Sequence, residues 1–177
     1  IFIIVILMTL ALSTAFSQTG WIWQNPLPQG NTLRSVYFAD DNTGWTVGYV
    51  GTILKTTNGG IYWTNQVSGT SNYLWSVHFE DKNTGWTAGY AGTILKTTNG
   101  GTNWIGQSSG TGNLLNSVYF ADMNFGWAVG NNGLIIRTTN GGSNWEAQIS
   151  GTSNLLNSVY FTDINFGWAV GLNSTIL

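Results

Sequence analysis

The sequence predicts an all-β protein, a β-propeller of four-stranded antiparallel blades, and three observations lead to this prediction. The phrase KTTNGGIYW at 55–63 returns as KTTNGGTNW and then as RTTNGGSNW, each time after 41 residues. Every interval holds four short segments rich in β-branched and aromatic residues, with turn residues between them. No ten-residue window shows a helical period without a glycine. A period near 40 fits a propeller blade or a helical pair, and the strand pattern favours the blade.

The repeats set the expected domain boundaries. Alignment on Leu-x-Ser-Val gives blades at 33–73, 74–114 and 115–155, and a partial blade at 156–177. In the first blade we expect strands at 33–40, 43–49, 51–57 and 63–69. The last unit stops at NSTIL, so we expect a truncated ring. Residues 18–32 contain WIWQ, which matches the start of the fourth strand, so we expect this segment to complete a closing blade. That blade is either the fourth unit of a small ring or, as we prefer, the last unit of a larger one.

The first 17 residues differ from the rest of the chain. They are apolar and end with small residues at Ala15 and Ser17, as an export signal does. A buried strand or a membrane anchor is the alternative, but the apolar core at 1–12 is short for a span of about 20 residues. We expect a signal peptide without its basic n-region and a secreted, periplasmic or cell-surface protein. Membrane contact is expected only through this signal.

Composition excludes several classes of function. The chain has 177 residues, 7% charged residues, a net charge of -2 and no cysteine. Lack of cysteine excludes a disulfide framework and thiolate metal sites. Five Lys and Arg in total argue against nucleic acid as a partner. No phosphate loop, nucleophile elbow or zinc signature is present, so we expect no cofactor and no metal.

The repeated phrase contains a turn signal between the third and fourth strands. Asn-Gly favours a type I′ turn, in which both central residues have positive φ. Gly59 and Gly60 suit left-handed backbone, and Asn58 can bond the backbone as an Asx turn. Trp63 is expected to begin the fourth strand and to fold back over the corner. The phrase is therefore predicted to be a structural staple, present once in each blade.

This phrase resembles the Asp-box, or BNR repeat, whose pattern is Ser/Thr-x-Asp-x-Gly-x-Thr-Trp. Two departures are consistent: Asn replaces Asp, and Tyr62, Asn103 or Asn144 replaces the seventh residue. The resemblance implies a structural hairpin on the rim and no catalytic role. The matching residues are Thr56, Asn58, Gly60, Trp63, Thr97, Asn99, Gly101, Trp104, Thr138, Asn140, Gly142 and Trp145.

The whole unit, from SVYFADDNTGW to GTILKTTNGG-x-x-W, resembles the photosystem II stability/assembly factor-like family of propellers. The resemblance covers nearly all of 33–177 and implies the fold more than the function. Photosynthetic members bind a partner protein through an arginine-rich patch, and this chain has only Arg34 and Arg137. Many exported bacterial proteins carry such blades without a photosynthetic role.

The best candidates for ligand contact are aromatic residues at positions that vary between repeats. Trp75 is replaced by Arg34, Asn116 and Asn157 in the other units, so its position is expected to face solvent or the channel. We expect Tyr73, Tyr49 and Tyr90 to extend the same patch if the strand ends share a face.

Other repeated positions have a structural interpretation beside the functional one. Asp-x-Asn-x-Gly resembles the start of a calcium loop, but no acid completes the ligand set, so a capped turn is favoured. One cation per blade would form an anion-binding ring, or merely a solvated charge before the turn. The repeated Gly-Trp is expected to pack between blades, and His78 to replace a tyrosine ring. The aspartates of the repeated turn are Asp40, Asp81, Asp122 and Asp163. The repeated cations are Lys55, Lys96 and Arg137, and the tryptophans of the Gly-Trp pair are Trp45, Trp86, Trp127 and Trp168.

Two function classes follow. The favoured hypothesis is an exported, non-catalytic propeller that binds a protein or a glycan. The alternative is a fragment of an Asp-box glycoside hydrolase, of the sialidase or xyloglucanase type, with catalytic residues outside the fragment. A pure spacer is a third possibility. An acid copied into every blade indicates scaffold, and Glu80 and Glu146, which break the symmetry, lie in different units, so no catalytic pair of carboxylates is evident.

Overall fold

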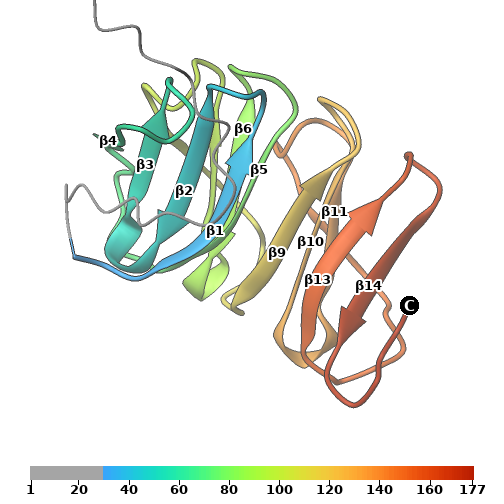
Figure 1. Cartoon of the computed structure of the whole chain (residues 1–177). Helices are drawn as coiled ribbons and strands as arrows, with labels where there is room; N and C mark the ends of the chain where they lie inside the picture. The colour runs from blue at the N-terminus through green and yellow to red at the C-terminus, as the bar shows by residue number, and fades with distance from the viewer. Residues whose placement is uncertain (1–29) are drawn as a thin grey trace, which may run out of the picture.

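The protein forms four antiparallel sheets that stand side by side as blades (Figure 1). The computed structural model describes residues 30–177. The first blade holds β1 (Leu33–Phe38), β2 (Gly44–Gly48), β3 (Ile53–Thr56) and β4 (Thr64–Gln66). The second holds β5 (Leu74–Phe79), β6 (Gly85–Gly89), β7 (Ile94–Thr97) and β8 (Ile105–Gln107). The third holds β9 (Leu115–Phe120), β10 (Gly126–Gly130), β11 (Ile135–Thr138) and β12 (Glu146–Gln148), and the fourth holds β13 (Leu156–Phe161) and β14 (Gly167–Gly171).

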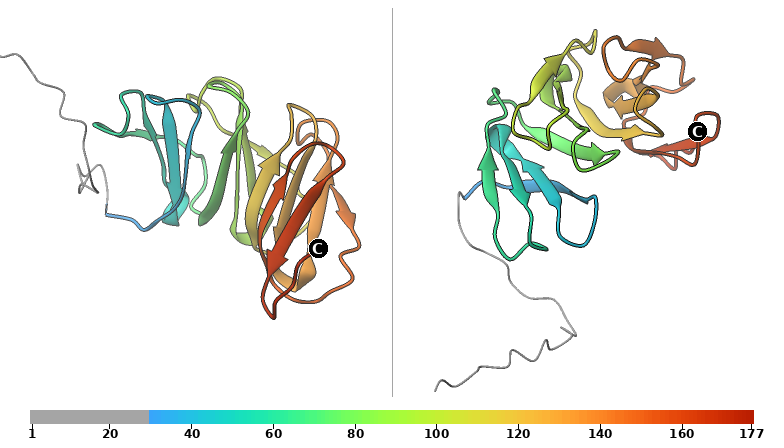
Figure 2. Two further views of the ribbon diagram at one scale, coloured as in Figure 1. Left: turned by 45° about the vertical axis from the view of Figure 1, so that its right-hand side comes forward. Right: turned by 90° about the horizontal axis from the view of Figure 1, so that it is seen from above.

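This architecture confirms the prediction of an all-β propeller built from four-stranded blades. Seen from above, the sheets follow an open curve and do not close into a ring (Figure 2). The expected signal peptide at 1–17 lies outside the described residues, as does 18–29 of the expected closing strand. Within 30–177, no helix has the length and apolar character needed to cross a membrane.

Aromatic stacking joins each blade to the next. A tryptophan of the second strand lies flat on the phenylalanine that ends the inner strand of the following blade, with ring centroids 3.5 to 3.6 Å apart. Contact at this distance removes the facing surfaces of both rings from water, and burial of apolar surface stabilises the boundary. The repeated tryptophans therefore pack between blades. The pairs are Trp45 with Phe79, Trp86 with Phe120, and Trp127 with Phe161.

Polar bonds cross the same boundaries. The serine hydroxyl oxygen of one inner strand accepts a backbone N–H from the next, as Ser76 does from Val118 at 3.1 Å. The indole N–H of Trp86 donates to the carbonyl of Gly141, in the corner of the next blade, also at 3.1 Å. The indole bond is buried and the serine bond is partly buried, so both favour one register of a blade on its neighbour.

Side chains hold the corner between the third and fourth strands. Thr97 Oγ1 accepts the N–H of Asn99 and of Gly101, and it donates to Asn99 Oδ1. Asn99 Oδ1 also accepts the N–H of Asn103 at 2.9 Å. The corners at Thr56, Asn58, Gly60 and Tyr62 and at Thr138, Asn140, Gly142 and Asn144 repeat these bonds.

Each corner is covered by the tryptophan that follows it. Trp104 Nε1 lies 3.3 Å from the point where a Cβ on Gly101 would stand, and the ring packs edge-on against Phe79 at 5.8 Å. Trp145 packs on Phe120 in the same way, and Trp63 on Phe38. The indole therefore folds back over its own corner, and glycine is needed there because a side chain would meet the ring.

The prediction of a type I′ turn centred on Asn58 and Gly59 is wrong. The left-handed residues are Gly59 and Gly60, with φ of 69° and 87°, and Asn58 is not among the residues with positive φ. The physical reason is that the Asn58 side chain is occupied as an acceptor for Thr56 and Tyr62, and this fixes its backbone in an ordinary region. The connection is also longer than a tight hairpin, since it runs from β3 to β4 over 57–63.

Candidate functional site

A β-bulge at the start of every inner strand creates the candidate site. The register of β5 on β6 pairs Leu74 with Gly89 and Ser76 with Ala88, and thus skips Trp75. A bulged residue is left unpaired and its side chain is re-aimed, which is why bulges often lie beside functional sites. The skipped residues of the four inner strands are Arg34, Trp75, Asn116 and Asn157.

These four bulged side chains line one pocket. Its volume is about 370 Å³, and Ser35, Ser76 and Ser117 complete its wall. The Arg34 guanidinium lies over the Trp75 ring, 3.9 Å from the ring centroid, as a cation–π pair. Trp75 Nε1 is buried and makes no hydrogen bond among the described residues. The Asn116 amide donates to the Leu156 carbonyl at 2.8 Å and so holds the third inner strand to the fourth.

The three candidate tyrosines form a separate aromatic group at the same end of the blades. Tyr49 stacks on Tyr73, with centroids 4.3 Å apart and ring planes within 4°, and Tyr90 lies 6.4 Å from Tyr73. Tyr49 and Tyr90 begin the 3₁₀ turns η1 (Tyr49–Gly51) and η2 (Tyr90–Gly92), and Tyr73 directly precedes β5. Because the Tyr90 N–H bonds to the Tyr73 carbonyl, the strand ends do share one end of the molecule. Within 30–177, the rings that pack on Tyr73 are those of Tyr49 and Tyr90, whereas the Trp75 ring faces the Arg34 guanidinium.

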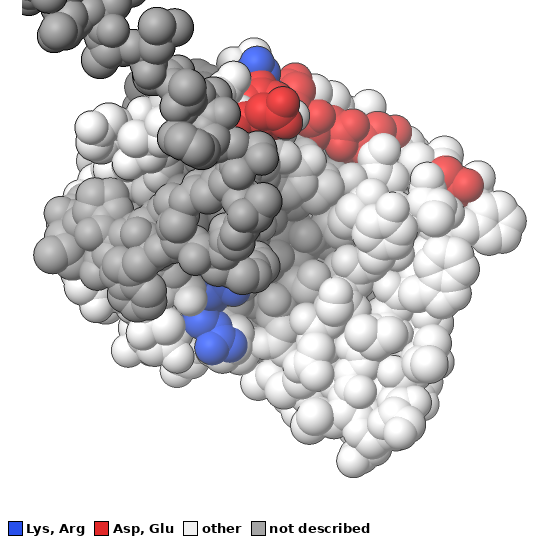
Figure 3. Space-filling view, viewed as in Figure 1, with Lys and Arg blue, Asp and Glu red and all other residues white. Residues whose placement is uncertain are grey.

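Charge is unevenly distributed along the blade axis. The acidic side chains gather along one edge of the face shown in Figure 3. Most of them come from the turns between first and second strands, and Glu146 starts β12 at the same end. Arg34 lies at the opposite end, where the inner strands begin. Among the described residues, the wall of the pocket therefore contains one cation, Arg34, and no carboxylate.

The repeated aspartates cap turns. Asp40 Oδ1 accepts the N–H of Asn42 at 2.8 Å and of Thr43 at 2.7 Å, and Asp40 also pairs with Lys82 of the next blade. The Lys82 bond and then the two backbone bonds hold the pKa of Asp40 far below its usual value. Asp81, Asp122 and Asp163 make the same pair of backbone bonds. No group of residues within 30–177 has a geometry suited to a metal ion.

The repeated cations reach across to the following blade. Lys96 Nζ donates to the Gly141 carbonyl at 2.8 Å and lies 5.1 Å from the Trp86 ring centroid. Burial lowers the pKa of both Lys55 and Lys96. Lys55 lies over Trp45, and Arg137 over Trp127, so these side chains cover the inter-blade stacks. They are neither a ring around the channel nor simply solvated charges.

His78 continues a row of aromatic rings on the inner strands. Its ring lies 5.2 Å from Tyr37 and 4.7 Å from Tyr119. Burial lowers the pKa of His78 to about 4, and Nε2 lies 3.8 Å from a Glu80 oxygen. The pKa of Glu80 is raised, first by burial and then by Asp122 and Asp81. His78 thus occupies the place of a tyrosine in the stack.

Sequence reasoning identified the Trp75 position but missed the bulge that makes a pocket of it. The available signal was the variable residue between Leu and Ser in an otherwise constant Leu-x-Ser-Val. It also missed the left-handed residue in each 3₁₀ turn, Val50, Ala91 or Asn132. Val50 is β-branched, and no sequence rule places such a residue at φ of 54°.

Comparison with known proteins identifies the family. Residues 14–109 and 63–150 match the family described as photosynthesis system II assembly factor YCF48. A solved structure of YCF48 bound to D1 peptide is 24% identical and covers 82% of this chain and 48% of that chain, with a TM-score of 0.68. YCF48 from Cyanidioschyzon merolae is 19% identical, and the match covers 82% of this chain and 49% of that chain, with a TM-score of 0.71. An ancestral GH74 enzyme is 16% identical, and the match covers 82% of this chain and 25% of that chain, with a TM-score of 0.57.

The chain spans about half the length of the YCF48 chains that it matches. No curated protein matches it. The matched residues cover most of the repeats, and the solved structures share the arrangement of blades described above. The chain therefore belongs to the YCF48 family of photosynthesis system II assembly factors, a family of β-propellers built from BNR repeats.

Proposed function

We propose that the chain is a non-catalytic scaffold that binds a segment of another protein in the pocket of the four bulged residues. The observation that carries this proposal is the pocket itself. A single cation, Arg34, and the unpaired indole N–H of Trp75 both lie in its wall. Both groups are hydrogen-bond donors, so they fit the carbonyl and carboxylate oxygens of a polypeptide.

The rigid frame around the pocket supports binding by shape. Each inner strand is bonded to its neighbour through a serine, and Asn116 adds a further bond across the third boundary. A preorganised wall loses little conformational entropy when a ligand binds. The solved YCF48 complex, whose title describes YCF48 bound to D1 peptide, supports a peptide as the class of ligand.

A glycan is the second candidate ligand. The stacked Tyr49 and Tyr73 and the exposed Tyr90 favour it, because aromatic faces pack well on sugar rings. A glycoside hydrolase is the alternative from another class, given the GH74 neighbour. The described residues that line the pocket carry donors and a cation, Arg34, which suits a bound ligand, whereas a glycosidase uses a pair of carboxylates beside the scissile bond.

A binding measurement on matched variants tests the proposal. The unmodified chain, Trp75→Ala and Arg34→Gln would be titrated with a library of short synthetic peptides and with an oligosaccharide panel, using fluorescence polarisation. Tyr62→Ala is the control, since Tyr62 is 67% exposed and lies at the opposite end of the blade. We expect peptides to bind, and Trp75→Ala to weaken them about tenfold or more, as removal of a central aromatic does. Equal peptide binding by Trp75→Ala, or binding of glycans alone, would contradict the proposal.

Export of the chain is also part of the proposal. It is supported by the apolar segment at 1–17 and its small residues before position 18. The test is expression with this segment in a bacterial host, followed by mass spectrometry of the periplasmic and extracellular fractions. A mature product that starts near position 18 is expected, and a product that stays uncleaved in the cytoplasm would contradict export.

A further inference from the structure

We propose that Glu80 and the rings beside it form a second subsite, which takes the guanidinium group of an arginine side chain from a bound polypeptide. The inference rests on the proposed function for the class of ligand, but it concerns other residues. Trp75 lies near the start of β5 and Glu80 directly after its end, so roughly 17 Å of extended strand separates the two sites. The acidic side chains gather at the Glu80 end (Figure 3).

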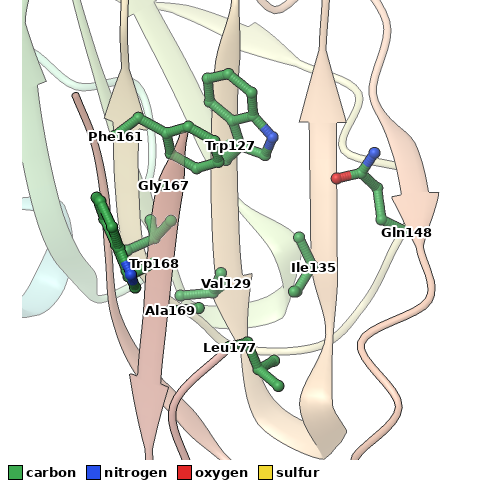
Figure 4. Close-up of a pocket in the computed structure, with 10 residues that line it drawn as sticks. Trp127, Val129, Ile135, Gln148, Phe161, Gly167, Trp168, Ala169 and Leu177 are labelled. Carbon is green, nitrogen blue, oxygen red and sulfur yellow. The ribbon is translucent and has the colours of Figure 1, made fainter. Parts of the chain in front are cut away.

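A row of polar rings crosses the inner strands beside Glu80. Its members are Tyr37, His78, Tyr119 and Tyr160, one from each repeat. Successive ring centroids lie 5.2, 4.7 and 5.0 Å apart. Adjacent residues of a strand face opposite sides, so this row is distinct from the phenylalanines that stack between blades, such as Phe161 on Trp127 in Figure 4. Tyr37 and Tyr119 are half-buried, so part of each ring reaches the surface.

Glu80 stands beside this row without a cation to balance it. The equivalent residues of the other repeats are Ala39, Ala121 and Thr162, so the carboxylate occurs in one blade. Within 30–177, Glu80 forms no ion pair with a lysine or an arginine, because the nearby Lys82 pairs with Asp40. Burial raises the pKa of Glu80, and the charges of Asp122 and Asp81 raise it further. A bound cation would offset this repulsion between like charges.

The His78 imidazole gives a second observation, independent of the acidic side chains. His78 is 8% exposed, and its Nε2 is buried without a hydrogen-bond partner among the described residues. The ring bonds the backbone of Phe120, so the proton lies on Nδ1 and Nε2 carries the lone pair. Nε2 lies 3.8 Å from a Glu80 oxygen. Two acceptors therefore face each other, and a donor between them is missing.

An arginine side chain suits both acceptors and the rings. Its guanidinium carries five N–H donors in a planar fork, so one edge can bond the Glu80 carboxylate while another N–H points at His78 Nε2. Its face packs well on aromatic rings, and Tyr37 and Tyr119 flank His78 on its two sides. The Glu80 side chain is 31% exposed, so the carboxylate can be reached from solvent. An ammonium has the same charge but lacks the planar fork.

Nuclear magnetic resonance of His78 tests the subsite. His78 is the one histidine of the sequence, so its nitrogen-labelled imidazole gives signals without overlap. The purified chain would be titrated with acetyl-arginine amide and, as the matched probe, with uncharged acetyl-citrulline amide. We expect a saturable shift of the Nε2 signal with the arginine probe alone. Glu80→Gln is expected to lose this shift, whereas Asp41→Asn is expected to keep it, since Asp41 is an exposed acid in the turn of another blade.

Several outcomes would overturn the inference. If the imidazole proton lies on Nε2 before any probe is added, a donor already faces Glu80 and none is missing. Equal shifts with both probes, a response that persists in Glu80→Gln, or its loss in Asp41→Asn would also overturn it. Circular dichroism would verify that both variants keep their β-structure.

This inference and the proposed function fail in different ways. Peptides that bind through Trp75, together with a His78 signal that ignores the arginine probe, would overturn the subsite alone. A His78 signal that responds to the probe in a chain that binds no peptide would contradict the proposed function and leave the guanidinium site in place.

Discussion

Replacement of Trp86 by alanine removes the side chain that joins the second blade to the third. Trp86 is 0% exposed, and its ring lies 3.5 Å from that of Phe120. Truncation of a buried tryptophan costs about 3–5 kcal/mol of unfolding free energy. The substitution also removes the indole bond to the Gly141 carbonyl. Lys96 Nζ still donates to this carbonyl at 2.8 Å, so the carbonyl keeps a hydrogen bond and adds nothing to the cost. At about 2–4 °C per kcal/mol, the melting temperature is expected to fall by about 6–20 °C.

Trp168→Ala is the matched control for this prediction. Trp168 occupies the same repeat position but is 50% exposed, so its truncation is expected to cost on the order of 1 kcal/mol. Urea and thermal unfolding would be followed by circular dichroism for both variants and for the unmodified chain. If Trp168→Ala costs as much as Trp86→Ala, the stability does not come from inter-blade stacking and the reasoning is refuted.

Three further predictions concern the corners, the 3₁₀ turns and pH. Thr97→Val removes the hydroxyl that makes three bonds in a buried corner and should cost about 1–3 kcal/mol, whereas Thr97→Ser should cost less; equal losses in urea unfolding would contradict this. Val50→Asn should stabilise the chain by about 1 kcal/mol, because asparagine tolerates φ of 54° better than valine does; a lower melting temperature would show otherwise. Burial lowers the pKa of His78 to about 4 from 6.5, so the stability that it contributes is present above pH 6.5 and is lost as the pH falls toward 4. The neighbouring Glu80, whose pKa is raised, acts in the opposite sense, and His78→Tyr should flatten the dependence of the urea midpoint on pH; an unchanged slope would exclude His78 as its source.

Much of the fold could be predicted because the repeat specifies interactions between residues that are close in the sequence. The period places the strands, and the Thr, Asn, Gly and Trp of the corner act on one another within eight positions. The strands of the first blade differ from the predicted ranges only at their ends. The type I′ assignment failed because the Asn58 side chain, which propensity rules treat as a turn former, serves as an acceptor for two neighbours.

The candidate site could be predicted only in part, because it depends on contacts between repeats. Variability singled out Trp75, but its pairing with Arg34 joins residues 41 positions apart. The role of Lys96 likewise depends on Gly141 in the next blade. A repeat shows which residues recur and does not show which neighbour they meet across a boundary. Whether Trp75, Tyr73, Tyr49 and Tyr90 touch a ligand stays a prediction.

The bonds between blades have a consequence for how such chains change in number of units. The serine bonds join residues 42 positions apart, and the indole bonds join residues 55 apart. Each bond thus reaches from one unit into the next, so duplication or loss of a whole 41-residue block re-creates every donor opposite its acceptor. Loss of a single residue inside a strand would instead shift the donors and acceptors of that strand out of register with the next blade. A change by whole units therefore keeps the inter-blade bonds paired, whereas a change within a strand does not.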